Sequence, residues 1–286
     1  MSDQEFVDKI LKAEHHPMDQ YLRDDRLPWI FCTGCGVGSV MNAYVHALDR
    51  SGIDTTKAAV VSGIGCTGRS SGYLNIDGFH TTHGRAIPFA SGLKIANPEL
   101  NVTVFSGDGD LFAIGGNHII QAARRNMDMT IICVNNSIYG MTGGQVAPTT
   151  PVDSWTTTTP YGAFEPPFNL VYLMASAGAV YVARWTALDI RRLTDAIEEA
   201  LTKKGFAFIE VIAQCPTTYG RRNNYREGIT MLKYFEEKAK IKHGMDPKDA
   251  PYVVGEEFYI GKFVDIEGKP TFTDMLEKVR NRAMKK

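Results

Sequence analysis

The sequence predicts an α/β protein whose mostly parallel sheet is flanked by helices. Short apolar runs typical of buried strands occur at 58–62, 102–106, 129–134, 179–184 and 206–213. Segments with helical apolar spacing separate these runs. Strands that alternate with helices favour parallel pairing, with both faces of the sheet covered.

Five helices are predicted between and beside these strands. Apolar residues recur at helical spacing over 39–50, 85–96, from Asp110 to about Asn126, and over 169–176 and 188–204. The helix at 85–96 ends before Asn97-Pro98, where proline disfavours continuation.

Two segments depart from this alternation. Residues 137–167 are rich in Gly, Pro and Thr, and so long a loop is either functional or disordered. After about residue 216 the chain is charged and aromatic, and we predict no strand there. This tail either wraps a neighbouring subunit or forms a solvated extension. We therefore expect an N-terminal arm at 1–30, a main domain at 31–220 and a C-terminal extension at 221–286.

Composition excludes several classes of protein. The 286 residues include 31 Lys and Arg against 32 Asp and Glu, for a formal charge of −1. Without a basic excess, binding to nucleic acid or to a membrane surface has little electrostatic support. No apolar run approaches the roughly 20 residues that span a bilayer. The acidic, polar start does not resemble a signal peptide, so we expect a cytoplasmic protein.

Two polar motifs follow neighbouring predicted strands. Gly107-Asp108-Gly109-Asp110 comes directly after 102–106, and Asn135-Asn136 comes after 129–134. The 25 residues between Gly109 and Asn135 suffice for a helical crossover to a parallel strand, so the two strand ends can meet. Carboxylate, amide and carbonyl oxygens there, with phosphate oxygens at a helix N-terminus, would form a Mg²⁺ site. Two unrelated turns are the alternative.

The chain has five cysteines. An odd number of cysteines in an intracellular chain of this size argues against a disulfide framework. Cys32-Thr-Gly-Cys35 has the spacing that lets both sulfurs face one centre, which could be zinc, an iron–sulfur cluster or a redox dithiol. Cys66 in a glycine-rich loop and Cys215 before Pro216 are candidates for two further ligands. Cys133 lies within an apolar run, so we assign it to the core.

The Gly-Asp-Gly and Asn-Asn pair resembles the diphosphate and metal motif of thiamine diphosphate enzymes. This resemblance implies that Asp108 and the Asn136 side chain are Mg²⁺ ligands, with the Ile138 carbonyl as a third. It also implies that Gly109 and Asp110 lie against the diphosphate.

A more specific resemblance covers about residues 28–220. The segments CTGCG, GIGCTGRSSGY, HTTHGRA, FSGDGDLFAIGGNH and VNNSIYGMTGGQVAPTTP occur in the order found in β subunits of 2-oxoacid:ferredoxin oxidoreductases. This resemblance implies a thiamine-diphosphate-binding domain with one [4Fe–4S] cluster nearby. The implied cluster ligands are Cys32, Cys35, Cys66 and Cys215. The further cofactor contacts it implies are Ile64, Gly65, Cys66, Thr67 and His83.

The roles of His80, Arg69 and Arg85, which lie near these motifs, stay open. Zinc ligation or an ordinary polar contact is the alternative for both His80 and His83, and we favour a diphosphate contact for His83 alone. Arg69 and Arg85 are each a partner of phosphate or of a substrate carboxylate, or else members of surface ion pairs.

The resemblance also implies a reaction. It is the thiamine-dependent oxidative decarboxylation of 2-oxoglutarate with coenzyme A to succinyl-CoA, CO₂ and reduced ferredoxin, reversible toward CO₂ fixation. The GMTGGQ form and the lack of further ferredoxin-like cysteine motifs favour 2-oxoglutarate. Pyruvate or broad 2-oxoacid use is the alternative. Other classes are a non-catalytic iron–sulfur or zinc scaffold and a non-redox thiamine decarboxylase, which would not need four cysteines.

One part of such an enzyme is missing from the chain. Thiamine enzymes use a glutamate on a second domain to protonate the aminopyrimidine of the cofactor, and this chain has no room for that domain. We therefore assign no catalytic side chain here and expect an α subunit to supply the acidic activator, in an (αβ)₂ assembly. Ferredoxin, a 2-oxoacid and coenzyme A are the other expected partners.

Overall fold

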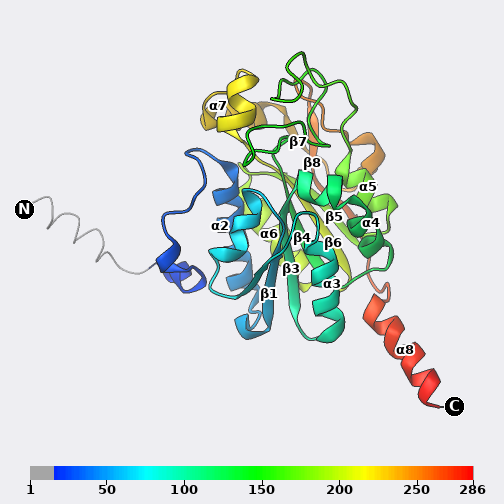
Figure 1. Ribbon diagram of the computed structural model, residues 1–286. Helices are drawn as coiled ribbons and strands as arrows, with labels where there is room; N and C mark the ends of the chain where they lie inside the picture. The colour runs from blue at the N-terminus through cyan, green and yellow to red at the C-terminus, as the bar shows by residue number, and fades with distance from the viewer. Residues whose placement is uncertain (1–15, 286) are drawn as a thin grey trace, which may run out of the picture.

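The computed structural model describes residues 16–285, in which eight strands form one sheet (Figure 1). Their order across the sheet is β2-β1-β3-β4-β6-β5-β8-β7. All neighbouring strands pair in parallel except β5 and β8, which are antiparallel. The strands are β1 Ala58–Ser62, β2 Asp77–His80, β3 Asn101–Gly107, β4 Met129–Asn135, β5 Tyr181–Thr186, β6 Phe206–Ile212, β7 Ala239–Ile241 and β8 Phe258–Asp265.

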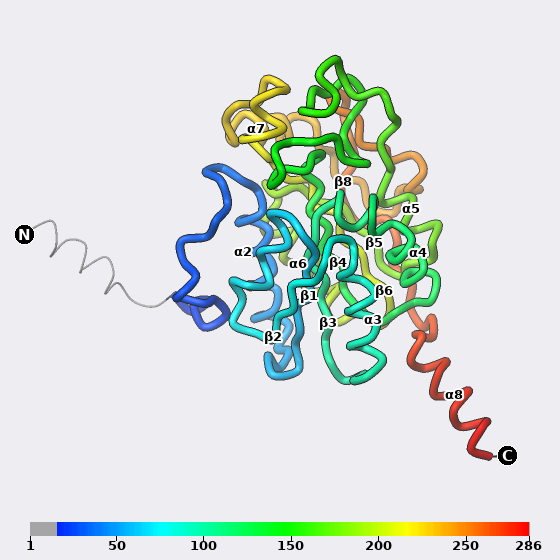
Figure 2. The backbone as a smooth tube through the Cα atoms, in the orientation of Figure 1, coloured from blue at the N-terminus to red at the C-terminus, as the bar shows by residue number. Residues whose placement is uncertain are grey.

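Helices cover both faces of this sheet, as the alternating pattern predicts. Side chains of α2, α6 and α7 pack on one face, and those of α3, α4 and α5 pack on the other. The final helix, α8, extends away from the body of the molecule (Figure 2). The helices are α2 Gly36–Ser51, α3 Ala86–Ala96, α4 Gly116–Arg124, α5 Leu170–Ser176, α6 Ile190–Thr202, α7 Gly228–Lys238 and α8 Phe272–Met284.

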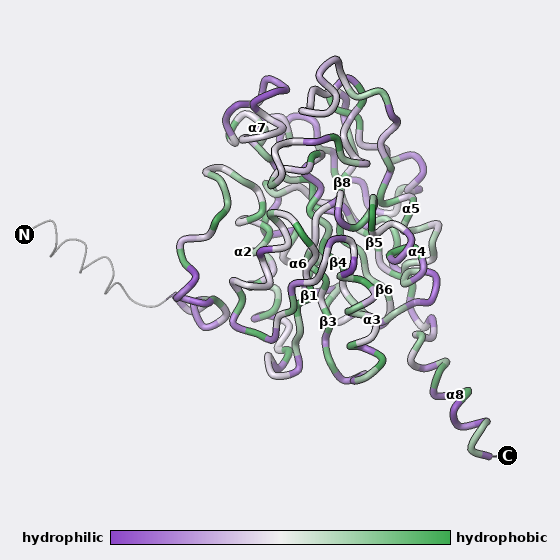
Figure 3. Tube along the Cα trace, in the orientation of Figure 1, coloured by the Kyte–Doolittle hydropathy of each residue, from purple (hydrophilic) through white to green (hydrophobic). Residues whose placement is uncertain are grey.

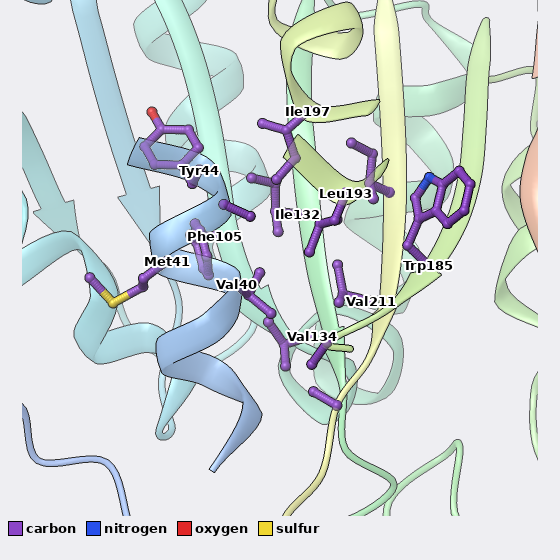
Figure 4. Packing of buried hydrophobic residues seen from close by; sticks show 14 of the residues in the cluster. Val40, Met41, Tyr44, Phe105, Ile132, Val134, Trp185, Leu193, Ile197 and Val211 are labelled. Carbon is purple, nitrogen blue, oxygen red and sulfur yellow. The ribbon is translucent and has the colours of Figure 1, made fainter. Parts of the chain in front are cut away.

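The larger part of the core lies between the sheet and the α2–α6 pair (Figure 4). Helix α2 places apolar side chains three or four residues apart, which puts Val40, Met41 and Tyr44 on the face that meets the sheet. It ends at Gly52, whose φ of 65° is the left-handed conformation that favours glycine after a helix. This helix begins directly after Cys35, so its packing sets the position of the cysteine motif.

The predicted strands and helices are found within a few residues of their expected ends. The run at 58–62 matches β1, and every residue of β4, β5 and β6 is buried, as expected for central parallel strands. Strand β2 was not predicted, because all four of its residues are exposed and carry no apolar run. After Gly107-Asp-Gly-Asp110 the chain forms a short π-helical turn, Asp110–Ile114, before α4 begins.

The expectation that no strand follows residue 216 is wrong. Strands β7 and β8 lie in the tail, and β8 pairs with β5 at the edge of the parallel sheet. Half of the β8 residues are buried, although the segment reads as charged and aromatic. The tail is thus part of the main sheet, while the proposed boundary at residue 220 stays a prediction.

The long loop at 137–167 contains no regular helix or strand, as predicted, and is held by hydrogen bonds within itself. The Thr156 hydroxyl accepts from the amides of Thr158 and Thr159, and the Thr157 amide donates to the Gly144 carbonyl at 2.8 Å. The loop lies at the same end of the molecule as α7 (Figure 2). The loop is therefore ordered, and a functional role for it stays a prediction.

None of the helices formed by residues 16–285 combines the length and the apolar character that crossing a membrane requires. Figure 3 agrees, because hydrophobic residues concentrate inside the molecule and α8 mixes both kinds of residue along its length.

One ion pair is fully buried in the sheet. Arg184 on β5 donates from Nε to Glu210 Oε2 on β6 at 2.7 Å, and the two side chains are 0% and 1% exposed. The Arg184 guanidinium also donates to the Ala250 carbonyl, and Glu210 Oε1 accepts from Asn135 Nδ2 at 2.7 Å. The pair therefore connects the C-terminal segment to the end of β4, where the Asn-Asn motif begins.

Replacing Glu210 with glutamine should lower the free energy of unfolding by about 3–5 kcal/mol, because the Arg184 charge would be left buried without a counter-charge. Urea unfolding of the purified chain measures this change. The matched control is Glu99→Gln, since Glu99 pairs with Lys57 on the surface, and such exposed pairs contribute about 0–1 kcal/mol. Equal losses in the two variants would contradict the account.

Candidate active site

A cavity of about 120 Å³ lies at the carboxyl ends of the neighbouring strands β1, β3 and β4. Loops that follow parallel strands meet at this edge of a sheet, which is where ligands of such folds bind. All ten residues that we expect around the cofactor diphosphate and its metal line this one cavity: Ile64, Gly65, Cys66, Thr67, His83, Asp108, Gly109, Asp110, Asn136 and Ile138.

Asp108 lies directly after β3 and is 2% exposed. Its Oδ2 accepts from the hydroxyl of Thr149 and from the amide of Ser137 at 3.1 Å. Burial raises the pKa of the Asp108 carboxyl to about 6, and these hydrogen bonds offset only part of that effect. A buried carboxylate whose partners are neutral is stabilised by a cation. Asp108 therefore suits the role of a hard-oxygen metal ligand.

The turn after β4 faces Asp108. Ser137 has a φ of 61°, a left-handed conformation that reverses the chain just past Asn135 and Asn136. Because the Ser137 amide donates to Asp108, the two strand ends meet, as the spacing of the motifs predicts. The Asn136 side chain and the Ile138 residue both line the cavity. The three expected Mg²⁺ ligands thus lie around one space.

Asp110 joins three loops. Its Oδ1 accepts from the amides of Ile64 at 3.0 Å and Gly84 at 2.8 Å, and its Oδ2 accepts from the Ser106 hydroxyl at 2.7 Å. His83 Nδ1 also lies 2.5 Å from Asp110 Oδ1. The carboxylate thereby fixes the loops after β1 and β2 against the end of β3. The sequence motif alone does not reveal this role.

His83 is oriented by that contact. With Nδ1 bound to Asp110, Nε2 is the ring nitrogen available for another partner. The ring also meets Tyr139 edge to face, with centroids 6.0 Å apart, and it lines the cavity. His83 is therefore placed to contact an anionic ligand there.

Two glycines permit the loops to approach this closely. A Cβ on Gly63 would lie 1.8 Å from Asp110 Oδ2, and a Cβ on Gly109 would lie 2.3 Å from the Tyr139 ring. Either side chain would displace the groups that form the cavity wall. Gly109 is thus packed against Tyr139, whose hydroxyl also donates to the Gly109 carbonyl at 3.1 Å.

Four of the cysteines gather beside this cavity. Cys35 interacts electrostatically with Cys32, Cys66 and Cys215, and burial raises the pKa of its thiol to about 12. A point at the Cβ position of Gly140 lies 3.7 Å from Cys215 Sγ and 3.8 Å from Cys66 Sγ. The structure thus brings together the four residues that the sequence predicts as cluster ligands. Burial and mutual repulsion disfavour four free thiolates, whereas a bound metal centre would stabilise them.

Among residues 16–285, no group of three or more His, Cys, Asp or Glu side chains has the arrangement of a single-ion metal site. An iron–sulfur cluster at the four thiols stays a prediction.

The fifth cysteine is separate. Cys133 lies within β4, is 0% exposed and packs among apolar side chains on the face covered by α3, α4 and α5. Burial raises the pKa of its thiol well above the usual value. It has the surroundings of a core residue, as its apolar neighbours in the sequence predict.

The three residues with open roles surround the site at different depths. His80 lies at the end of β2 with part of its side chain in solvent. Partial removal of its ring from water lowers the pKa of His80, and the nearby positive charge of Arg69 lowers it further. Arg69 keeps a buried Nε without a hydrogen-bond partner. Arg85 donates to the Gly84 and Ile114 carbonyls and is exposed. Neither arginine forms an ion pair with another of residues 16–285, and the roles of both stay open.

Besides glycines, sequence reasoning missed four side chains of the cavity wall or its support. Tyr139, Met141 and Thr142 line the cavity, and Thr149 contacts Asp108 from outside it. All four lie in or beside the Gly- and Thr-rich loop, where no periodic pattern indicates which side chains face inward.

Comparisons with known proteins agree with this geometry. Residues 63–211 match the family model described as "Thiamine pyrophosphate enzyme, C-terminal TPP binding domain". The 2-oxoglutarate synthase subunit KorB of Methanothermobacter marburgensis is 51% identical over 255 residues, or 89% of each chain. The corresponding subunit of Methanocaldococcus jannaschii is 51% identical over 92% of this chain and 97% of its own length.

The chain belongs to the β-subunit family of 2-oxoacid:ferredoxin oxidoreductases. A solved structure of this family is the 2-oxoglutarate:ferredoxin oxidoreductase from Magnetococcus marinus with 2-oxoglutarate, coenzyme A and succinyl-CoA bound. It matches with a TM-score of 0.85 and 33% identity, over 96% of this β subunit and 92% of that chain. The α/β fold and the thiamine-binding domain expected for this β subunit are therefore confirmed.

Proposed function

We propose that this β subunit forms half of a cytoplasmic 2-oxoglutarate:ferredoxin oxidoreductase. It would hold the diphosphate end of thiamine diphosphate, one Mg²⁺ ion and one [4Fe–4S] cluster, and act with an α subunit in an (αβ)₂ assembly. The observation that carries this proposal is the cavity lined by all ten expected cofactor contacts, with four thiols at its edge.

The residues at the carboxyl ends of β3 and β4 would bind the metal and the diphosphate. Asp108 offers a buried carboxylate, Asn136 an amide oxygen and Ile138 a carbonyl, which are the oxygen ligands that Mg²⁺ prefers. His83 would contact a diphosphate oxygen through Nε2, while Asp110 holds the imidazole and the Ile64 loop in place.

The four cysteines would hold the cluster at the edge of the same cavity. Cys66 belongs to both sets of residues, because it lines the cavity and lies among the thiols. When bound, thiamine diphosphate supplies an electron sink for decarboxylation of a 2-oxoacid, and an iron–sulfur cluster accepts electrons one at a time. The shared position of Cys66 would keep the two cofactors adjacent.

The mouth of the cavity supports the need for a second chain. Ile64 and Met141 line it and are 40% and 47% exposed. Exposed apolar side chains at the rim of a binding site are typical of a surface that another protein covers. An α subunit placed here would exclude water and carry the acidic group that activates the cofactor.

The substrate in this proposal follows the relatives. The two archaeal subunits are named for 2-oxoglutarate synthase, and the solved neighbour contains 2-oxoglutarate, coenzyme A and succinyl-CoA. We propose the same acid for this protein, with electrons passing to ferredoxin and with the reaction able to run in reverse.

The test is acyl-CoA formation by the β subunit co-purified with its α subunit. We expect succinyl-CoA from 2-oxoglutarate, coenzyme A and oxidised ferredoxin, and much slower product formation from pyruvate or branched 2-oxoacids. A preference for pyruvate would overturn the substrate assignment. Turnover by the isolated β subunit equal to that of the complex would overturn the divided site.

A further inference from the structure

We propose that a basic surface beside the four thiols is the docking site for a small acidic electron-carrier protein. The basic surface consists of Arg221, Arg222 and Arg226 together with Trp155. This inference rests on the proposed function, because it assigns the place where electrons leave the chain.

The arginines follow Cys215 closely along the chain. A short π-helical turn, Pro216–Gly220, leads from Cys215 to Arg221. Gly34, between Cys32 and Cys35, contacts the same region, since a Cβ there would lie 3.4 Å from Gly228 Cα and 3.8 Å from Pro216 Cγ. Pro216 and Gly228, on either side of the three arginines, thus pack against the cysteine motif. Figure 1 places α7, which begins at Gly228, near the N-terminal end of α2.

The charge of this surface differs from that of the whole chain. Residues 216–235 contain three arginines and Lys233 but one acidic residue, Glu227, whereas the chain has a formal charge of −1. Arg221, Arg222 and Arg226 are exposed. Arg222 donates to the Thr218 carbonyl, a neutral group. Clustered positive charges that face solvent attract an acidic partner and speed its association.

A preformed groove adjoins the arginines. It has a volume of about 460 Å³, and Arg222 and Trp155 line it. Trp155 is 57% exposed, yet its backbone is held on both sides by Asn223, which accepts from its amide at 2.8 Å and donates to its carbonyl at 3.1 Å. Asp153 is the acidic residue of the groove wall. An ordered, exposed tryptophan in the same groove wall as an arginine matches the composition of binding hot spots.

The position of Cys32 favours an electron carrier over other acidic partners. Cys32 is the exposed member of the four thiols, so a centre held by them would come nearest to solvent at Cys32, two residues from the Gly34 contact with Gly228. In the step assigned to this surface, a cluster held by the four cysteines would lose one electron and the oxidised partner would gain it, with no bond or proton changing place. Redox encounters of this kind use small, charge-steered interfaces.

The experiment uses the αβ complex and charge-reversal variants Arg221→Glu, Arg226→Glu and the double variant. The matched control is Arg282→Glu on α8, at the opposite end of the molecule (Figure 1). Calorimetry would measure the Kd for an acidic two-cluster ferredoxin at low and moderate salt. Rates would be measured with that ferredoxin and with a viologen, a small acceptor that needs no docking surface.

We expect the double variant to raise the ferredoxin Kd at least about tenfold and to reduce its salt dependence, with viologen rates and iron content unchanged. The control should match the unaltered complex. An unchanged Kd and salt dependence in the double variant would overturn the proposal. So would loss of α-subunit binding, because the surface would then belong to the subunit interface. Absence of viologen reduction in the unaltered complex would instead defeat the proposed function.

Discussion

Replacing Asp108 with asparagine should raise the Kd for thiamine diphosphate in the presence of Mg²⁺ by about 100-fold, a loss of about 2.8 kcal/mol. Asp108 is the single carboxylate among the three expected metal ligands, and a dication that bridges a diphosphate needs anionic oxygen. The neutral amide has nearly the same size, so the hydrogen bond from Ser137 and the packing around it should persist.

Calorimetric titration of the αβ complex with thiamine diphosphate at several Mg²⁺ concentrations measures this change. Because the lost ligand acts on the metal, excess Mg²⁺ should restore part of the affinity. Asp25→Asn is the control, since Asp25 is exposed and pairs with its neighbour Arg26. Full cofactor affinity of the Asp108 variant in metal-limited buffer would contradict the Mg²⁺ assignment.

The second large effect concerns the cysteines. Cys215→Ala should reduce the iron content from about four atoms per chain to near zero, because a [4Fe–4S] cluster is held by four thiolates. Cys133→Ala should leave iron unchanged and lower stability slightly, since Cys133 is buried among apolar side chains of the sheet. Iron and acid-labile sulfide analysis of anaerobically purified protein measures both variants.

Comparing these two variants distinguishes a cysteine that binds the cluster from a cysteine that packs in the hydrophobic core. Equal iron loss in Cys133→Ala and Cys215→Ala would mean that misfolding, or a different ligand set, explains the result. Zinc in place of iron in the unaltered protein would contradict the assignment of an iron–sulfur cluster.

The sequence allowed the central strands and the site to be predicted for related reasons. Buried parallel strands must be apolar throughout, so β1 and β4 are visible as short runs. Polar residues directly after such strands, like Asp108 and Asn136, then fall at the one edge where the strand ends meet. The positions of these groups follow from topology and need no knowledge of side-chain contacts.

Other features depend on tertiary contacts that leave little pattern in the sequence. Strand β8 is an antiparallel edge addition, so its residues are only partly buried and alternate irregularly. Asp110 reads as a second ligand of the motif, yet its hydrogen bonds run to Ile64, Gly84 and Ser106. Arg184 and Glu210 are charged residues in otherwise apolar strands, and only the register of β5 and β6 reveals them as a pair.

The central claim is that electrons from a 2-oxoacid at the Asp108 cavity reach a cluster held by this same chain. Electron paramagnetic resonance of the αβ complex, mixed anaerobically with 2-oxoglutarate and coenzyme A but no acceptor, tests it most directly. The account predicts the spectrum of a reduced [4Fe–4S] cluster that is absent in the Cys215→Ala variant. An iron-containing complex that forms succinyl-CoA with ferredoxin present, but whose cluster stays oxidised throughout turnover, would contradict it.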